Sequence, residues 1–254
     1  MSEHRADSHF AAGTNPQDLG PAIVTFHVWG VPTRALPSAV AAMARDRRPL
    51  QATDGLSFFK LLGTGSGRTF TPRDADPHHW AILATWDSVA AADAFENSDV
   101  VRAWDRRSSE RLRIAMKPLA SKGYWAKLQP FGNPSNSAHD GPVAALTRAR
   151  IKPRQWPAFW RSVGPVTHEL HRSPGLLLAV GIGEAPVGLQ GTLSLWESSA
   201  KVNDFVHRTA AHRQVIRRTE QLNWYAEELF ARFAIVSIQG QHRGRGVAAP
   251  ALDQ

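Results

Sequence analysis

A repeat between the two halves is the feature that most constrains how this chain can fold. DGLSFFKLLGTG at residues 54–65 matches PGLLLAVGIGEA at residues 174–185, at an offset of 120 residues. AILATWDSVAAADAF, which ends at Phe95, matches GTLSLWESSAKVNDF, which ends at Phe205, at an offset of 110. A repeat of this kind predicts that one structural unit is built twice. The shorter second offset predicts a longer hairpin in the first copy, at residues 68–79, and an extra loop of that kind often covers a site.

Each copy reads as strand, helix, strand, strand, helix, strand, which is the order of a ferredoxin-like unit. In the first copy we expect these elements at residues 22–29, after 33, and at 56–62, 79–86, 88–114 and 123–128. In the second copy we expect them at residues 143–151, 154–171, 176–182, 190–196, 199–222 and 231–238. The predicted fold class is α+β, with tandem duplicated ferredoxin-like units whose antiparallel sheets pack face to face as a sandwich.

Polar segments set the predicted boundaries of the two units. Residues 1–20 and 240–254 lack apolar periodicity and are predicted to be flexible tails that carry no chemistry. GNPSNSAHDG at residues 132–141 is rich in Asn, Ser, Gly and Pro and is predicted to be a linker. The N-terminal unit is therefore expected at residues 21–131 and the C-terminal unit at residues 142–239.

The composition narrows the chemistry and the location. The chain has 254 residues and no cysteine, so it forms no disulfide and any metal must rest on His, Asp, Glu or Tyr. No stretch approaches about eighteen uninterrupted apolar residues and the first residues lack a secretory signal, so we expect a cytoplasmic protein without a transmembrane segment. The net charge of +8 favours acidic partners, but no nucleic-acid-binding signature accompanies it, and no nucleic acid partner is expected.

His212 is the most informative histidine. On the helix predicted at residues 199–222, residues spaced by three and four positions form one inward stripe, composed of Val202, Phe205, Thr209, His212, Ile216 and Thr219. His207 lies about 200° around the helix from Phe205 and is predicted to point to solvent. The matching helix of the first copy has no histidine, and its equivalent position is Arg102. An inward His212 is either a core imidazole bonded to backbone or a metal ligand or acid–base group.

Three arginines accompany His212 in the second copy: Arg148 and Arg150 on its first strand and Arg232 on its last. A forked guanidinium can bind a carboxylate through two hydrogen bonds. We expect the two strands to lie at opposite edges of the sheet, so that these arginines cannot clamp one ligand by adjacency. His78 and His79 fall in the long hairpin, where solvated loop histidines are expected and gating of a substrate is the alternative.

In order from about Val24 to Ile235, the chain contains the motifs FFKLLGTGSGRTFTP, AILATW, GPVAALTRARI, GIGEAP, LSLW, the helix around His212 and NWYAEELFARF. Together these motifs resemble the spheroidene monooxygenase family of carotenoid biosynthesis. The resemblance implies a haem-dependent monooxygenase of the dimeric α+β barrel superfamily. Such an enzyme inserts oxygen at a carbon of a small-molecule substrate, using dioxygen and electrons from a reduced ferredoxin.

The resemblance also implies how the cofactor is held. His212 is implied as the proximal ligand to the iron of haem b, because related haem proteins use one histidine on a helix of the C-terminal unit. The haem propionates are then expected to reach Arg148, Arg150 or Arg232, with Phe205 and Ile216 beside the haem.

Other functions stay open at this point. The substrate is either a carotenoid or another natural-product intermediate, and relatives of this fold also carry out dehydration or oxidation at nitrogen with haem. A cofactor-free monooxygenase of the same barrel type is a second alternative. A third is a non-catalytic protein that binds haem or another apolar ligand. A homo-oligomer is compatible with each of these functions.

Overall fold

The computed structural model describes residues 20–65, 74–134, 137–155, 169–184, 191–208 and 225–247. The first half contains β1 (Ile23–Gly30), α1 (Leu36–Arg45), α2 (Arg47–Gln51), β2 (Leu56–Gly65), β3 (Ala75–Trp86), α3 (Val89–Phe95), α4 (Asp99–Arg107) and β4 (Glu110–Gly123). The second half contains β5 (Val143–Ile151), β6 (Leu176–Gly183), β7 (Gly191–Trp196), α6 (Ser199–Arg208), β8 (Tyr225–His242) and β9 (Arg245–Gly246). Short 3-10 helices lie at Thr33–Ala35 and Pro153–Gln155. The fold is therefore α+β.

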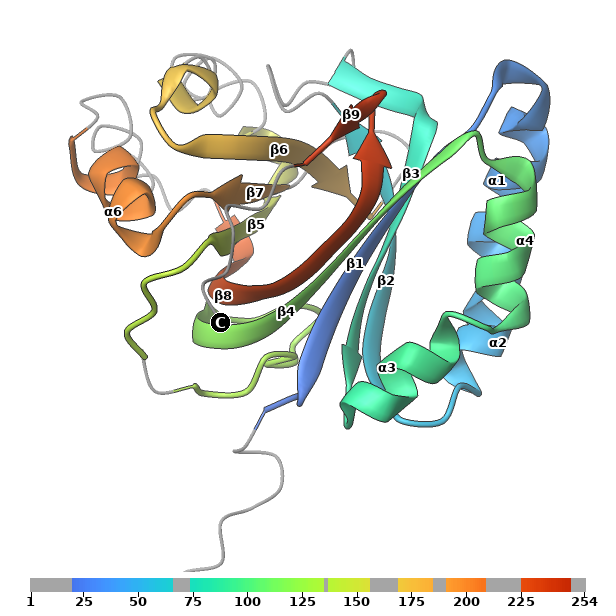
Figure 1. Ribbon diagram of the computed structural model, residues 1–254, viewed down its shortest axis with the longest axis horizontal. Helices are drawn as coiled ribbons and strands as arrows, with labels where there is room; N and C mark the ends of the chain where they lie inside the picture. Colours follow the sequence, from blue (N-terminus) through green and yellow to red (C-terminus); the bar gives the residue numbers. More distant parts are fainter. Residues whose placement is uncertain are drawn as a thin grey trace, which may run out of the picture.

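The strands named above form one large antiparallel sheet, in the order β4-β1-β3-β2-β6-β7-β5-β8-β9. β2 pairs with β6, and β4 pairs with β8, so the strands from β1 to β8 close into a ring (Figure 1). The sequence predicted an α+β fold whose antiparallel sheets pack face to face as a sandwich, and the α+β class and the antiparallel pairing are confirmed. The halves do face each other, but hydrogen bonds at both junctions make them one sheet, because pairing satisfies strand edges that would otherwise be left open.

The helices lie outside the ring (Figure 1). α1, α2, α3 and α4 cover the first half, and α6 lies over the second half. None of the helices in the described ranges is both long and apolar enough to cross a bilayer.

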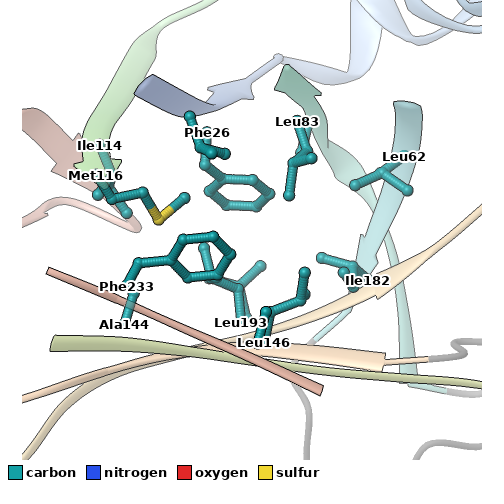
Figure 2. Packing of buried hydrophobic residues seen from close by; sticks show 14 of the residues in the cluster. Phe26, Leu62, Leu83, Ile114, Met116, Ala144, Leu146, Ile182, Leu193 and Phe233 are labelled. Atoms are coloured by element: carbon teal, nitrogen blue, oxygen red, sulfur yellow. The ribbon is translucent and has the colours of Figure 1, made fainter. Parts of the chain in front are cut away.

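The inside of the ring is filled by apolar side chains from both halves. Phe26 and Met116 from the first half point toward Leu193 and Phe233 from the second (Figure 2). Phe131, which follows β4, packs edge-on against Phe233 with ring centroids 4.9 Å apart. Full burial of one such side chain contributes roughly 1.5–3 kcal/mol. The described side chains thus form a packed core inside the ring.

Two glycines show how closely the halves match. Gly55 and Gly175, aligned at the offset of 120, have φ of 72° and 83°, a region that residues with a Cβ rarely adopt. A Cβ at Gly55 would lie 2.6 Å from the Cβ of Ala91, and one at Gly175 would lie 2.6 Å from the Cγ of Lys201. Ala91 and Lys201 are themselves aligned at the offset of 110. The same tight turn therefore meets the same helix position in both halves.

The long helix predicted at residues 88–114 is in fact two shorter helices. The Ser88 hydroxyl accepts a hydrogen bond from the backbone N–H of Ala91 and starts α3 (3.1 Å). The Ser98 hydroxyl accepts one from the backbone N–H of Val101 and starts α4 (3.2 Å). Each serine satisfies a backbone donor that the first turn of a helix leaves unpaired, so each begins a new helix.

β4 was placed too late by the sequence prediction, which expected a strand only at residues 123–128. The strand begins at Glu110, and Leu112, Ile114 and Met116 all point into the ring. This alternation has the period of a strand. It was mistaken for helix because Leu, Met, Arg and Lys are also strong helix formers.

β8 is longer than the predicted strand at residues 231–238, and it continues beyond the boundary predicted for the C-terminal tail at residue 240. The strand ends at His242, and Arg243 and Gly244, with φ of 55° and 69°, form a tight turn to β9. Positive φ at both central residues is typical of the two-residue turns that connect hairpin strands. The start of the predicted tail is therefore part of the sheet.

Candidate functional site

The outward face of the second half is the surface on which the sequence analysis placed the site. The strands β5, β6, β7 and β8 carry this face, and α6 packs over part of it (Figure 1). Trp196 and Val202 are buried there in one apolar cluster, and Phe205 packs on Trp196 with ring centroids 5.5 Å apart. Val202 and Phe205 are the first members of the predicted inward stripe. The described part of α6 therefore presents that stripe to the sheet, as expected.

The strand registers identify corresponding outward positions in the two halves. Trp86 lies opposite Ile23, and Trp196 lies opposite Val143. Counted from these pairs, the first half carries Thr25, His27, Trp29, Phe59, Leu61 and Ile82 on its outward face. The second half carries, in the same order, Ala145, Thr147, Ala149, Ala179, Gly181 and Thr192. The second half thus has small side chains at most positions where the first half has large ones.

An aromatic layer fills the outward face of the first half, beneath α3 and α4. Trp29 is fully buried and stacks on Trp104 with ring centroids 5.5 Å apart. Its Nε1 donates a hydrogen bond to Oδ1 of Asp105 (2.7 Å). Phe95 packs against Trp86 with ring centroids 5.0 Å apart, which is the counterpart of the contact between Phe205 and Trp196.

A charged network accompanies this aromatic layer. His27 Nε2 lies 3.0 Å from Oε1 of Glu96, which also accepts a hydrogen bond from Nε of Arg113 (2.9 Å) and pairs with Arg111. Burial alone would raise the pKa of Glu96, but its bond to His27 and the charges of both arginines outweigh it and lower the pKa to about 2. Burial lowers the pKa of His27. The first half is therefore both packed and internally paired beneath its helices.

Arg232 lies on the outward face of the second half, beside α6. β5 and β8 are neighbours, with Ala145 opposite Arg232, so the expectation that these two strands lie at opposite edges was wrong. The order β6-β7-β5-β8 places the first strand of this half inside the sheet, and the last strand returns beside it. Nη1 of Arg232 donates a hydrogen bond to Oδ1 of Asn203 on α6 (3.3 Å). Arg232 thus joins the sheet to the helix on this face.

Arg148 points to the other side of β5, into one end of the ring. Its side chain is 5% exposed, and Nη2 donates a hydrogen bond to Oε1 of Glu184 (2.7 Å). The guanidinium also pairs with Glu227 and lies over the ring of Trp125 at 5.4 Å. Arg148 is thus already paired with two carboxylates and does not share a face with Arg232. Arg150, one alternation further along β5, is exposed.

Further bonds hold these carboxylates in place. Lys60 Nζ donates to Oε2 of Glu184 (2.9 Å), and Trp125 Nε1 donates to its Oε1 (2.8 Å). Burial alone would raise the pKa of Glu184, but the hydrogen bonds from Lys60 and Arg148 outweigh it and lower the pKa.

Glu227 lines a cleft of about 970 Å³ between the end of β4 and the start of β8, together with Ser121, Lys122, Gly123, Tyr124, Lys127, Gln129, Asn133, Tyr225, Ala226 and Glu228. The ion-pair network of Arg148, Glu184 and Glu227 therefore reaches the cleft at this end of the ring.

His212 and Ile216, the proposed iron ligand and its neighbour on the stripe, lie outside the described residues. α6 is described as far as Arg208. The assignment of His212 therefore stays a prediction from the sequence.

His78 and His79 lie on β3, where the sequence analysis expected solvated loop histidines. His78 Nδ1 is 3.0 Å from the carbonyl oxygen of Val31. His79 is mostly buried, with Nδ1 2.8 Å from Oδ2 of Asp76 and Nε2 2.7 Å from Oε1 of Glu110. Burial alone would lower the pKa of His79, but these two hydrogen bonds outweigh it and raise the pKa. Neither histidine is therefore a solvated loop residue.

Sequence reasoning missed the residues around His79. Glu110 begins β4, and His242 ends β8 in the segment assigned to a tail. The ring of His242 lies edge-on to that of His79 with centroids 4.7 Å apart, and burial lowers the pKa of His242 to about 4. A possible signal was Gly30, which ends a strand of bulky residues and lies between His79 and Glu110 in the sheet.

No sequence-family profile matches the chain. Among curated proteins, spheroidene monooxygenase from Rhodobacter capsulatus is 36% identical over 216 residues, which cover 84% of this chain and 89% of the relative. Spheroidene monooxygenase from Rubrivivax gelatinosus is 34% identical over 244 residues, which cover 94% of this chain and 93% of the relative. The chain belongs to the spheroidene monooxygenase family. The resemblance inferred from the motifs is confirmed.

Solved structures show that this member of the spheroidene monooxygenase family shares its fold with other proteins. A crystal structure of aldoxime dehydratase in complex with butyraldoxime aligns with a TM-score of 0.56, over 89% of this chain and 84% of that chain. A second crystal structure of aldoxime dehydratase aligns with a TM-score of 0.54. Both are 11% identical in sequence, so the likeness concerns the fold alone.

Proposed function

We propose that this member of the spheroidene monooxygenase family is a haem-dependent monooxygenase that acts on an apolar small molecule of the spheroidene type. Similarity to relatives named for this activity supports the reaction class. The observation that carries the haem assignment is the small-residue outward face of the second half.

A flat cofactor held between a helix and a sheet needs small side chains on the sheet beneath it. The second half places Ala149 and Ala179 where the first half places Trp29 and Phe59. In the first half these large side chains belong to one buried apolar cluster, in which Trp29 stacks on Trp104. The residues of the second half therefore fit a planar group, and those of the first half do not.

His212 is the proposed ligand to the haem iron, because a neutral imidazole is the usual proximal ligand where no cysteine is present. Phe205 and Ile216, on the same predicted stripe, are proposed to contact the haem. Arg232 is the proposed partner of a propionate, since it shares the outward face with α6 and a guanidinium binds a carboxylate well. Arg150 is exposed, but it lies two residues from Arg148 and therefore on the same side of β5, so it is not proposed as a propionate partner on this face. We propose that Arg148 keeps its interior ion pairs instead.

Bound haem would supply an iron centre for activating dioxygen, so that one oxygen atom enters the substrate and the other leaves as water. Two electrons and two protons are needed for this balance, and reduced ferredoxin is the proposed electron donor. The net charge of +8 supports an acidic partner of that kind.

We also propose that the two halves are tandem ferredoxin-like units. The order β4-β1-β3-β2 in the first half recurs as β8-β5-β7-β6 in the second. The matching turns at Gly55 and Gly175 support the same interpretation.

The haem assignment is tested by absorption spectra of the purified full-length protein with and without added haem. We expect a Soret band in the wild type, and a lost or shifted band in His212→Ala. His207→Ala is the matched control, because His207 is predicted to point away from the sheet on the same helix. A Soret band that is indifferent to His212→Ala would contradict the ligand assignment. No haem binding at all would favour the cofactor-free monooxygenase.

Turnover distinguishes the enzyme from a binding protein. The haem-loaded protein is incubated with spheroidene, reduced ferredoxin and ¹⁸O₂, and the product is examined by mass spectrometry. We expect a product that carries one ¹⁸O atom and that forms only when the reductant is present. Haem binding without such a product would favour the non-catalytic alternative.

A further inference from the structure

A second cluster of polar residues lies where the end of β8 meets β3 and β4, away from the proposed haem face. The donor atoms of His79, Glu110 and His242 all lie within 4.8 Å of one another. The side chains of His79 and Glu110 are 12% and 11% exposed, and His242 is 7% exposed. Two imidazoles and a carboxylate are a donor set that suits Zn²⁺ and similar divalent ions.

His79 has the orientation of a metal-binding histidine. A histidine that binds a metal through one ring nitrogen almost always donates its other ring N–H to a carboxylate or carbonyl. Nδ1 of His79 is 2.8 Å from Oδ2 of Asp76, and Nε2 is 2.7 Å from Oε1 of Glu110. A metal ion at Nε2 would keep the bond to Asp76 and would replace the proton shared with Glu110.

His242 supplies an independent observation. Its Nδ1 is buried and has no hydrogen-bond partner among the described residues. The ring lies 4.7 Å from that of His79, edge-on. A buried nitrogen without a partner is unfavourable, and most such groups in folded proteins are satisfied. A metal ion bound at this nitrogen would satisfy it.

Gly30 makes room for the cluster. It lies on β1, opposite His79 on one side and Glu110 on the other. A Cβ at this position would lie 2.6 Å from Cγ of Glu110 and 3.1 Å from Nε2 of His79. The close approach of these two side chains across β1 therefore requires a glycine.

The turn between β8 and β9 holds the carboxylates. The backbone N–H groups of Arg243 and Gly244 donate to the two oxygens of Glu110, at 2.7 and 2.8 Å. Nη2 of Arg243 donates to Oδ2 of Asp76 (2.8 Å). Glu110 and Asp76 are thus positioned by the fold, which is the pre-organisation that a ligand site needs.

We propose that His79, Glu110 and His242 bind one Zn²⁺ ion, with Asp76 orienting His79, and that this ion fastens the β8–β9 turn to β3 and β4. The proposal does not depend on haem, since none of these residues lies on the outward face of the second half.

The test uses the full-length, haem-free protein, stripped with a chelator and titrated with ZnSO₄ by calorimetry. The wild type is expected to bind one equivalent more than His242→Ala, with a Kd on the order of micromolar or tighter. His79→Gln is expected to lose the same equivalent. His78→Ala is the matched control, because His78 is the neighbouring histidine on β3 and bonds to Val31 instead. Zinc at saturating concentration should raise the Tm of the wild type by roughly 5 °C, and that of His242→Ala by less.

Co²⁺ gives a readout that needs no variant. The Co²⁺-loaded wild type should show the visible absorption bands of a four- or five-coordinate nitrogen and oxygen site. If these bands are absent, or if His242→Ala retains every equivalent of zinc, the proposal is overturned and the cluster is an ion-pair network only. Neither result would alter the Soret band, so failure here is distinguishable from failure of the proposed function.

Discussion

The two halves of the ring share a strand pattern but differ in what lies beneath their helices. In the first half, Trp29 and Phe59 belong to one apolar cluster on the face that the helices cover. In the second half, the same positions are Ala149 and Ala179. The comparison teaches that two halves can keep one strand pattern while the outward face of one carries large side chains and that of the other carries small ones.

Trp29→Ala should have the largest effect on this comparison. Trp29 is fully buried, stacks on Trp104 and donates a hydrogen bond to Asp105, so its truncation leaves a cavity and an unpaired acceptor. We expect the free energy of unfolding to fall by about 4 kcal/mol, measured by urea denaturation. Ala149→Gly, at the corresponding position, should cost only about 1 kcal/mol. Equal losses would show that the two faces are packed alike.

Ala179→Phe converts one position of the second half to its counterpart in the first. The phenyl ring would occupy the face proposed for haem, so we expect haem affinity to fall at least tenfold, or about 1.4 kcal/mol. The measurement is a haem titration followed at the Soret band. Val40→Phe, on α1 and 57% exposed in the wild type, controls for an added aromatic ring. Unchanged affinity in Ala179→Phe would move the haem site away from this face.

Acid should lower the stability of the protein, because the network around Glu96 and His27 in the first half depends on their charge states. The pKa of Glu96 is lowered from 4.5 to about 2, so its contribution is fully present above pH 4.5 and is lost as pH falls toward 2. The pKa of His27 is also lowered, so the unfolded chain takes up a proton first as pH falls below 6.5, and stability falls there too.

Glu96→Gln is the variant that tests this acid dependence. At pH 7 we expect it to lower the free energy of unfolding by about 1 kcal/mol, after allowance for solvent screening. The difference from the wild type should shrink between pH 4.5 and pH 2, as measured by urea denaturation at several pH values. Asp99→Asn, on the exposed surface of α4, should change stability by no more than about 0.5 kcal/mol and serves as the control. A constant difference across that pH range would contradict the assigned network.

Arg232→Gln should have the smallest effect. Removing one guanidinium at the edge of the face is expected to weaken haem binding about threefold, or roughly 0.7 kcal/mol. Arg148→Gln should leave haem affinity unchanged and lower stability instead, because Arg148 pairs with Glu184 and Glu227 inside the ring. The opposite pattern would assign the propionate to Arg148.

Much of the fold could be read from local patterns. The repeat predicted the equivalent turns at Gly55 and Gly175, and the matching tryptophans Trp86 and Trp196 take equivalent places in the sheet. The prediction failed at β4, where residues that favour helices also alternate in and out of the ring. It failed again for the neighbours β5 and β8, because strand order depends on how the chain crosses the sheet.

The candidate site was likewise predicted in part from the sequence and in part not. Spacing along one helix predicted that Val202 and Phe205 face the sheet, and the structure confirms this. The first-half position equivalent to His212 is Arg102, which is exposed on α4 because the helix is interrupted before it. The interruption has a local cause, because the Ser98 hydroxyl caps the start of α4. Which side chains of α4 then face the sheet depends on how that helix packs in the tertiary structure.

The sequence by itself determined the family and the inward position of Val202 and Phe205 on α6, because these depend on residues that are close in the chain or on motif order. Only the tertiary structure decided that the sheet closes, that the second half is thin where the first is filled, and that His79, Glu110 and His242 meet. Those three residues come from β3, β4 and the end of β8. Strand pairing across long stretches of chain brings them together, and no local periodicity records that pairing.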